Sequence, residues 1–331
     1  MRISTTIPLH RARLRLMTAG LLAVSAGLLC GCSLEDPRDI CCTDASAMTY
    51  TYRPYGTEAF TDYIFTLRHF LFLREGELIG ELPPGEDLTY QPLDLPQGEY
   101  TMVTLGNAAA STVLNHDMCP HVSGFTLRHT PSTEGGHADE LYWGIRHFAI
   151  DSDHRATDLG PTSGRTTPGA LTRLTTEMNN IHCHITIRVE WANMPLYIGT
   201  HIMELDGVPS HYRLDPEEIS DAGGFVIPEV SDSLTRHRIS VAMDAHTLEG
   251  EFTTLRLTDE HIPTLRLYYN GEQVGPDMDL GKAFTAWGWH PSRIHVQKYQ
   301  ILVRLYGDGS AELSPSLDAS VADWINGGTF S

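Results

Sequence analysis

Two cysteines, Cys30 and Cys32, stand at the end of an apolar run in the segment LLCGCSLEDP (28–37). A thiol at this place can receive lipid acyl chains of the palmitate kind, if a signal peptidase cleaves just before it. Such cleavage needs a small residue before the cysteine and a leucine-like residue three positions before it. Cys32 has Gly31 and Leu29 at these two positions, whereas Cys30 follows a leucine that is too large. The pattern predicts lipidation at Cys32; the alternative is an ordinary signal peptide that contains cysteines.

Residues 1–31 have the composition of an export signal. Four arginines and no acid precede the apolar run 19–29, which is shorter than the roughly 20 apolar residues that cross a bilayer as a helix. We therefore exclude residues 1–31 from reasoning about the fold. Acyl chains on Cys32 would hold the mature chain on a membrane without spanning it. Acids cluster just after that cysteine, at Glu35, Asp36 and Asp39, which indicates the outer membrane and the cell surface.

The charge of the mature chain excludes some classes of partner. The whole chain has 23 basic and 42 acidic residues, and four of the basic ones lie in the signal. The mature chain therefore keeps 19 basic and 42 acidic residues, a formal charge of −23. Such a charge argues against nucleic acid and anionic headgroups as partners. It is consistent with a soluble surface protein.

Four further cysteines could form disulfides in the exported chain: Cys41, Cys42, Cys119 and Cys183. Export permits disulfides, and four cysteines allow three complete pairings. The alternative is that some stay free and buried, as is common for a cysteine on an apolar strand face such as Cys183. The sequence leaves this choice open.

Other groups that could bind metals or sugars have simpler explanations. The segment HDMCPH (116–121) is one compact cluster, whereas structural zinc sites usually use two separated pairs of ligands, so we expect no metal there. We interpret His182 and His184 as a solvated strand face. Trp287 and Trp289 could stack on a sugar, but we favour packing against the protein core. The possible metal ligands in HDMCPH are His116, Asp117, Cys119 and His121.

Motifs of common enzymes are absent from the sequence. It contains no G-x-S-x-G, no H-E-x-x-H, no P-loop and no G-x-G-x-x-G after a strand. Acids are plentiful, but nothing selects two of them as a glycosidase pair. We therefore expect no catalysis and no cofactor.

Strand patterns recur along the mature chain. The clearest is NNIHCHITIRVEW (179–191), in which apolar and polar residues alternate with period two. Asn270-Gly271 and Asp308-Gly309 are strong hairpin signals. Further strands are expected around 63–72 with a return after Gly76, and at 100–105, 141–150, 196–205, 236–243, 251–257, 264–269 and 299–306. These patterns predict an all-β fold.

A polar stretch at 151–170 divides these strands into two groups. It is rich in Gly, Pro, Ser and Thr, which is typical of a linker or a long surface loop. Many short strands on either side favour two β-sandwiches over one barrel. The expected domains are a signal (1–31), a tether (32–47), a first sandwich (48–150), the linker or loop (151–170) and a second sandwich (171–331).

Several segments, in order, resemble the FimB-type fimbrillin-associated anchor lipoproteins, from the type V fimbriae of anaerobic Gram-negative bacteria. The mature start CSLEDPRDICC is similar to the lipid cysteine, acids and second cysteine that open those chains, although Cys41-Cys42 is doubled here. The later segments that resemble the family are YIFTLRHFLFLREGELIGEL, QGEYTMVTLGN, ELYWGI, LTRLTTEMNNIHCHITIRVEW and SVADWINGG. They follow one another in this order along nearly the full mature length.

The resemblance implies two tandem transthyretin-like β-sandwiches without catalysis. It also implies an outer-membrane base that holds a shaft of fimbrillin subunits, with assembly by donation of a strand to an open sheet edge. Stalk subunits of such fimbriae lose their first strand. A chain attached through Cys32 would have to keep it, so we expect MTYTYR (48–53) to remain as the first strand. The alternatives are a surface glycan-binding lipoprotein and a tip or stalk subunit of the same fimbriae.

Overall fold

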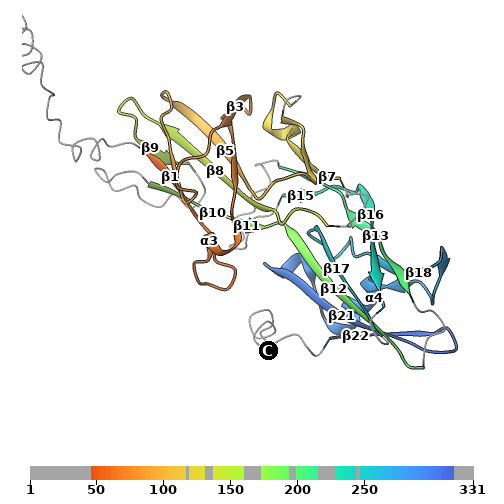
Figure 1. Cartoon of the computed structure of the whole chain (residues 1–331). Helices are drawn as coiled ribbons and strands as arrows, with labels where there is room; N and C mark the ends of the chain where they lie inside the picture. The colour runs from red at the N-terminus through yellow and green to blue at the C-terminus, as the bar shows by residue number, and fades with distance from the viewer. Residues whose placement is uncertain are drawn as a thin grey trace, which may run out of the picture. The chain divides into compact units, whose positions relative to one another are not determined.

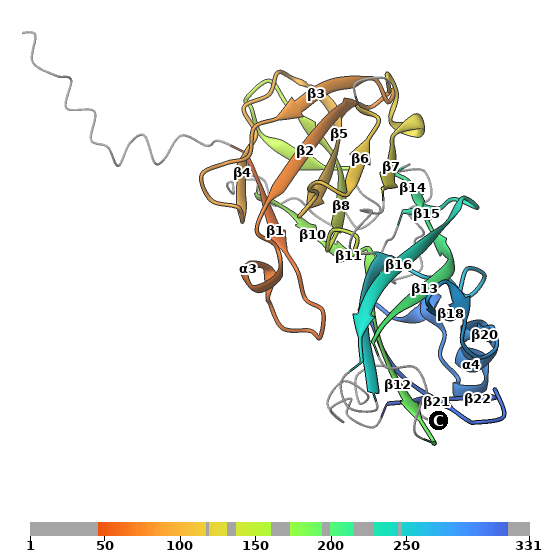
Figure 2. The same cartoon turned by 45° about the vertical axis from the view of Figure 1, so that its right-hand side comes forward.

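Strands make up about half of the residues that the computed structural model describes (Figures 1 and 2). The structure describes residues 46–116, 119–130, 137–159, 173–193, 199–214, 228–243 and 247–316. The helices within these ranges are short, the longer ones being α3 (Phe60–Tyr63) and α4 (Leu280–Trp287). The predicted all-β fold is confirmed. None of the helices described is both long and apolar enough to cross a membrane.

The first sandwich packs a large sheet against a small one. The large sheet has the order β11-β8-β5-β2-β3, with β9 beside β8, and the small one has the order β10-β1-β4. Met48 of β1, Leu71 of β2 and Phe148 of β8 meet in the core between them. The strands are β1 (Ala47–Thr51), β2 (Leu67–Leu73), β3 (Leu78–Leu82), β4 (Tyr90–Pro92), β5 (Gly98–Gly106), β8 (Tyr142–Ile150), β9 (Ala156–Asp158), β10 (Arg173–Glu177) and β11 (Asn179–Asn180).

The second sandwich has two sheets of the orders β17-β12-β21-β22 and β16-β13-β18-β19, with β20 beside β18. Its core includes Ile187 of β12, Leu205 of β13 and Phe284 of α4. The strands are β12 (His182–Trp191), β13 (Thr200–Pro209), β16 (Leu234–Ala242), β17 (Thr247–Leu255), β18 (Thr264–Tyr269), β19 (Glu272–Gln273), β20 (Met278–Asp279), β21 (Gln297–Leu305) and β22 (Ala311–Pro315).

A further sheet joins the two halves of the chain. It has the order β15-β14-β7-β6, and antiparallel pairing of β7 with β14 connects the halves. A third core lies beside it, with Phe70 and Phe125 from the first half and Tyr212 from the second. The strands of this sheet are β6 (Thr112–Leu114), β7 (Thr126–His129), β14 (His211–Arg213) and β15 (Glu229–Val230).

The third core explains why β2 is apolar without alternation. Leu71 points into the first core, while Phe70 and Phe72 point into the third. A strand buried on both faces reads as a continuous apolar run, and residues 70–73 have the sequence FLFL. The sheet that contains β2 therefore contributes to both cores.

Several predicted elements are confirmed by the structure. On β12 the alternate residues Cys183, Ile185 and Ile187 are fully buried. Asn270 and Gly271 both have positive φ between β18 and β19, as a two-residue hairpin of type I′ requires. The turn at Asp308-Gly309 separates β21 from β22.

The border between the sandwiches differs from the expected one. Strand β10 pairs with β1, and β11 pairs with β8, so the first sandwich extends to residue 180, beyond the expected boundary at 171. The polar stretch 151–170 begins with a strand, β9, that pairs with β8; residues 160–170 lie outside the described part. Both differences arise because strands pair with partners that are not identifiable from the local composition of the sequence.

A change at Gly144 tests how closely β10 and the residues after it pack over β8. A Cβ at Gly144 would lie 2.7 Å from Thr176 Cγ2 and 2.8 Å from Met178 Sδ. We expect Gly144→Ala to lower the free energy of unfolding by about 1–3 kcal/mol, because overpacking forces its neighbours apart. The control is Gly124→Ala, whose Cβ meets only Cys119 Sγ at 3.4 Å. Equal effects of the two changes in urea denaturation would contradict this packing.

Candidate functional site

Strand β1 is the first strand after the predicted tether, and it is paired along both edges. It runs parallel to β10 from Ala47, opposite Arg173, to Thr51, opposite Glu177. On its other edge it is antiparallel to β4 over residues 47–49. Residues 47–51 therefore form the central strand of this sheet, and Tyr52 and Arg53 of the predicted strand 48–53 follow it. Cys32 lies outside the described residues, and its lipidation stays a prediction.

The inward side chains of β1 form a column in the first core. Met48, Tyr50 and Tyr52 are each at most 3% exposed, which follows from the period of two in MTYTY. Tyr50 stacks on His69 with ring centroids 5.4 Å apart. Tyr52 packs edge-on against Tyr142 at 4.9 Å. Burial raises the pKa of Tyr50 and of Tyr52 far above the ordinary value of a tyrosine.

Hydrogen bonds fix the N-terminal end of β1, where a tether would pull. The Ser46 hydroxyl donates to the His154 carbonyl at 2.9 Å and accepts the Ala156 N–H at 2.5 Å. The Ser46 carbonyl accepts the Leu93 N–H at 2.8 Å. Ser46 thus joins β1 to the β8–β9 hairpin and to the segment after β4.

The C-terminal end of β1 is also fixed. The Thr51 carbonyl accepts the Met178 N–H at 2.8 Å, and Glu58 Oε1 accepts the Tyr52 N–H at 3.1 Å. In the middle, Thr49 Oγ1 donates to the Leu174 carbonyl at 3.1 Å. Each part of β1 is therefore held by elements that are distant in sequence.

A buried arginine lies where the two sandwiches meet. Arg256 is fully buried, and its guanidinium donates to the carbonyls of His295 at 2.7 Å, and of Asn180 and Pro291 at 3.4 Å each. Its backbone N–H donates to Tyr212 Oη at 2.7 Å. The Tyr212 hydroxyl in turn donates to a carbonyl of the segment between β11 and β12. Desolvation by burial lowers the pKa of Arg256.

The structure corrects one interpretation of the histidines on β12. His182 is only 2% exposed, so it is not part of a solvated face. The Leu141 carbonyl and the Tyr142 ring contact the His182 ring, and the structure brings His182, His184 and Glu140 together. Alternation along β12 places both histidines on one face, but only the tertiary fold supplies Glu140.

The cysteines that the structure describes are free thiols. Cys119 and Cys183 are both buried and form no disulfide with each other, and Cys183 lies in the core of the second sandwich. Burial raises the pKa of the Cys183 thiol well above its usual range. Cys41 and Cys42 lie outside the described residues, so a disulfide that involves them stays a prediction.

Hydrogen bonds within the loop HDMCPH (116–121) and to its neighbours hold it in place. Cys119 Sγ donates to the His121 carbonyl at 2.7 Å. His121 Nδ1 lies 2.8 Å from Ser123 Oγ, and its Nε2 bonds the Glu75 carbonyl. Both ring nitrogens of His121 are therefore engaged, one by Ser123 just after the loop and one by the turn between β2 and β3. Asp117 is outside the part of the chain that is described.

Trp287 and Trp289 pack against the second core, as favoured from the sequence. Their rings are 4.9 Å apart at 68°, an edge-to-face contact. Trp289 also stacks on Tyr299 at 5.2 Å. The two indoles therefore do not form the coplanar platform on which a sugar would stack.

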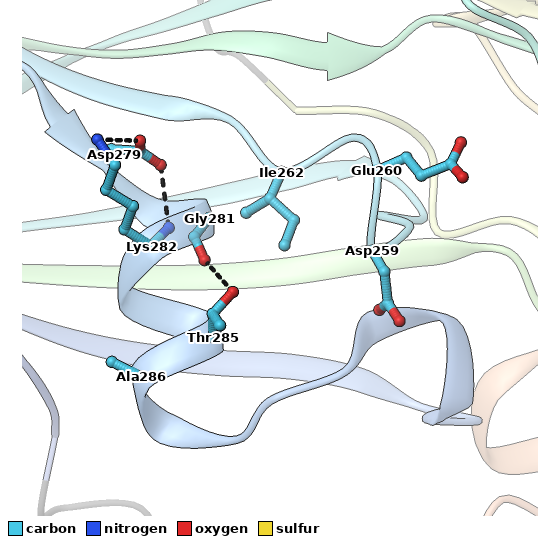
Figure 3. A pocket seen from close by; sticks show the side chains of 8 residues that line it. All are labelled: Asp259, Glu260, Ile262, Asp279, Gly281, Lys282, Thr285 and Ala286. Carbon is cyan, nitrogen blue, oxygen red and sulfur yellow. Dashed lines mark hydrogen bonds and ion pairs between the residues drawn. The ribbon is translucent and has the colours of Figure 1, made fainter.

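A hollow of about 580 Å³ lies beside α4 (Figure 3). Asp279 begins the helix by accepting the Lys282 N–H at 3.0 Å, and the Lys282 ammonium lies 3.2 Å from its other oxygen. These bonds lower the pKa of Asp279, with the backbone bond as the main cause. On the other side, Asp259 accepts the Ser292 N–H at 3.1 Å. These carboxylates fix a helix start and a loop, and their arrangement suggests no reaction.

Comparisons with known proteins agree with this architecture. The family model described as Fimbrillin-A associated anchor proteins Mfa1 and Mfa2 matches residues 46–326. The fold is similar to the fimbrial anchor protein Mfa2 from Porphyromonas gingivalis, with a TM-score of 0.53 and 13% identity over 81% of this chain and 94% of that chain. A search of curated protein sequences gave no match.

Two further solved structures, both from Bacteroides thetaiotaomicron, have similar folds. A candidate adhesin has a TM-score of 0.56 and 13% identity over 82% of this chain and 95% of its own. A candidate polysaccharide-binding protein has a TM-score of 0.56 and 13% identity over 83% of this chain and 98% of its own. At such identities the likeness shows the fold alone.

The buried histidines predict how stability depends on pH. Burial lowers the pKa of His69 and of His129 to about 4, and that of His182 to about 3. In the unfolded chain these groups titrate near 6.5, so the unfolded state binds more protons between pH 6.5 and 4. We expect the free energy of unfolding to fall as pH falls through this range, by up to about 1.4 kcal/mol per pH unit for each histidine.

Urea denaturation at several pH values measures this slope. His69→Gln should make the slope between pH 6.5 and 4 shallower, whereas the exposed His290 serves as the control in His290→Gln. A slope that His69→Gln leaves unchanged would contradict the assignment of His69 as a buried neutral group.

Proposed function

The chain belongs to the family of fimbrillin-A associated anchor proteins, and on that premise we propose that it anchors a fimbrial shaft to the outer membrane. Membership makes it a fimbria-associated surface protein. The proposed partners are a fimbrillin shaft subunit and, through lipid on Cys32, the outer membrane itself. The proposal includes no catalytic step.

The observation that carries the proposal is the seat of β1. A shaft that pulls on its base would load the tether, and the tether continues directly into β1. Both edges of β1 are paired, and the side chains of Met48 and Tyr50 on it, and of Tyr52 just after it, are buried in the first core. Fully burying one large apolar side chain contributes about 1.5–3 kcal/mol. Removal of β1 would therefore leave an open core, which suits a retained strand better than a strand that is cleaved away.

Strand complementation is the proposed way in which the shaft subunit is held. A sheet edge offers unpaired backbone N–H and C=O groups, and an added strand satisfies them. Within the described ranges, β16 pairs only with β13, and β22 pairs only with β21. Strand β16 is nine residues long, long enough for an extended ladder. We propose these two edges as candidate acceptors.

The neighbouring cysteines provide a matched test of anchoring. We expect Cys32→Ser to move the protein from the outer-membrane fraction to the soluble fraction and to release fimbriae into the medium, because the acyl chains are lost. Cys30→Ser should leave both unchanged, since Cys30 is discarded with the signal. Membrane retention of the Cys32→Ser protein would contradict lipid anchoring. Normal attachment of fimbriae despite its release would contradict the anchor function.

A second candidate function is glycan binding at the cell surface. Tyr55, Tyr63 and Phe65 lie on one short segment and are 48%, 40% and 63% exposed, and exposed rings can stack on sugars. Retention on bacterial and host polysaccharides distinguishes the two functions. If the protein binds glycans, polysaccharide columns should retain it, and Phe65→Ala should reduce this retention. If it is only an anchor, no retention should depend on the Phe65 ring.

A further inference from the structure

Glu140, His182 and His184 bring three metal-ligating side chains to the place where the two sandwiches meet. One ligand atom of each lies within 4.8 Å of the other two. Glu140 lies just before β8 of the first sandwich, and both histidines lie on β12 of the second. We propose that this cluster binds a divalent transition-metal ion of the zinc class, which then bridges the two sandwiches. The inference does not depend on the anchor function.

The backbones that carry the three ligands are fixed. The Ala138 N–H donates to the Thr253 carbonyl at 2.7 Å, and the Ile181 N–H donates to the Leu141 carbonyl at 3.0 Å, so Glu140 stands between two anchored positions. Strand β12 is paired with β17 and, from Cys183 onward, also with β21. Sites on such rigid elements need little ordering of the chain when a ligand binds.

The hydrogen bonds of His182 leave a lone pair for a metal. Its Nδ1 lies 2.9 Å from the Leu141 carbonyl, which can only accept, so Nδ1 carries the proton and Nε2 the lone pair. A histidine that binds a metal typically donates its other N–H to a carbonyl in this way. Asn180 Nδ2 is 3.3 Å from Nδ1 and 3.1 Å from Nε2. Nearly equal distances place it beside the ring, away from the direction of the Nε2 lone pair.

His184 is oriented for the same role. Its Nδ1 lies 3.3 Å from Thr253 Oγ1, and its Nε2 lies 3.4 Å from Glu140 Oε1. The second distance exceeds the 2.7–3.2 Å of a good N–H···O bond, so the two side chains are near each other without forming a strong hydrogen bond. The rings of His182 and His184 are 4.9 Å apart and nearly perpendicular, at 82°, and one ligand atom of each lies within 4.8 Å of the other and of Glu140.

The donor set selects the class of ion. Two imidazoles and a carboxylate with an open position are the ligands of many zinc sites, with bonds of about 2.0–2.2 Å. Tetrahedral ligands at that length are about 3.3–3.5 Å apart. His184 Nε2 and Glu140 Oε1 are already at this separation, whereas a pair at the 4.8 Å limit would have to approach by about 1.3–1.5 Å. The Glu140 and His184 side chains are 50% and 33% exposed and can make this movement. Imidazole donors disfavour Mg²⁺ and Ca²⁺.

The surrounding charges are mixed. Lys298 faces His184 in register on β21 and opposes a cation, while Glu251 favours one. His137 also lies near His184 and is exposed on the same segment as Glu140. Water or His137 can therefore complete the coordination.

Calorimetric titration of the mature chain in detergent with ZnCl₂ at pH 7.5 tests the site. The sample for this titration is prepared without a polyhistidine tag. It carries Cys41→Ser and Cys42→Ser so that these thiols cannot compete for zinc. We expect one equivalent of Zn²⁺ to bind. In thermal denaturation, ZnCl₂ should raise the midpoint of unfolding, whereas MgCl₂ should not. Glu140→Gln and His184→Gln should each weaken binding more than about tenfold, as loss of a ligand costs at least as much as loss of its supporting partner.

His290→Gln is the matched control, because His290 is also exposed beside a carboxylate, that of Asp259 at 3.8 Å. It should leave zinc binding unchanged. Circular dichroism at pH 7.5 confirms that each variant is folded, and Glu140→Gln changes only a half-exposed side chain. Absence of one-equivalent binding, or binding that neither Glu140→Gln nor His184→Gln weakens, would overturn the site. The anchor function is tested separately, by the membrane fractionation of the Cys32→Ser protein, and neither of these results bears on it.

Discussion

A strand that is hydrogen-bonded along both edges leaves a sheet only when two ladders break together, and β1 is held in this way between β10 and β4. Met48 and Tyr50 on it, and Tyr52 just after it, are buried in the first core, and Ser46 fixes its N-terminal end. These contacts come from segments that begin as far away as residue 173. Seating of the first strand is therefore a property of the whole first sandwich. The proposed anchor depends on it, because force applied to a lipid tether reaches the fold at this strand.

The first sandwich is connected to the second through the sheet that contains β2, which is buried on both faces. Strand β2 contacts the first core with Leu71 and the third core with Phe70 and Phe72. The third core continues into Tyr212, and β7 pairs with β14 across the same border. Arg256 adds hydrogen bonds to carbonyls around this border. The two sandwiches are thus joined by packing and pairing as well as by the chain, which suits a base that must transmit force without separating.

Local periodicity in the sequence was enough to predict most strands. Alternation predicted β12 and its buried face at Ile185 and Ile187, and Asn270-Gly271 predicted a hairpin. The burial of His182 could not be predicted, because the segment that covers it lies about forty residues earlier in the chain. For the same reason the place of β10 beside β1 was missed. Of the candidate sites, lipidation at Cys32 is a prediction from a processing motif, whereas the cluster with Glu140 required the tertiary fold.

The central claim is that the mature chain keeps both its lipid cysteine and its first strand. Intact mass and N-terminal peptide analysis of the protein purified from outer membranes tests this most directly. The account predicts a chain that begins with acylated Cys32 and continues without a break through Arg53. A mature protein on the cell surface that begins after Arg38 or after Arg53, without Cys32, would contradict it.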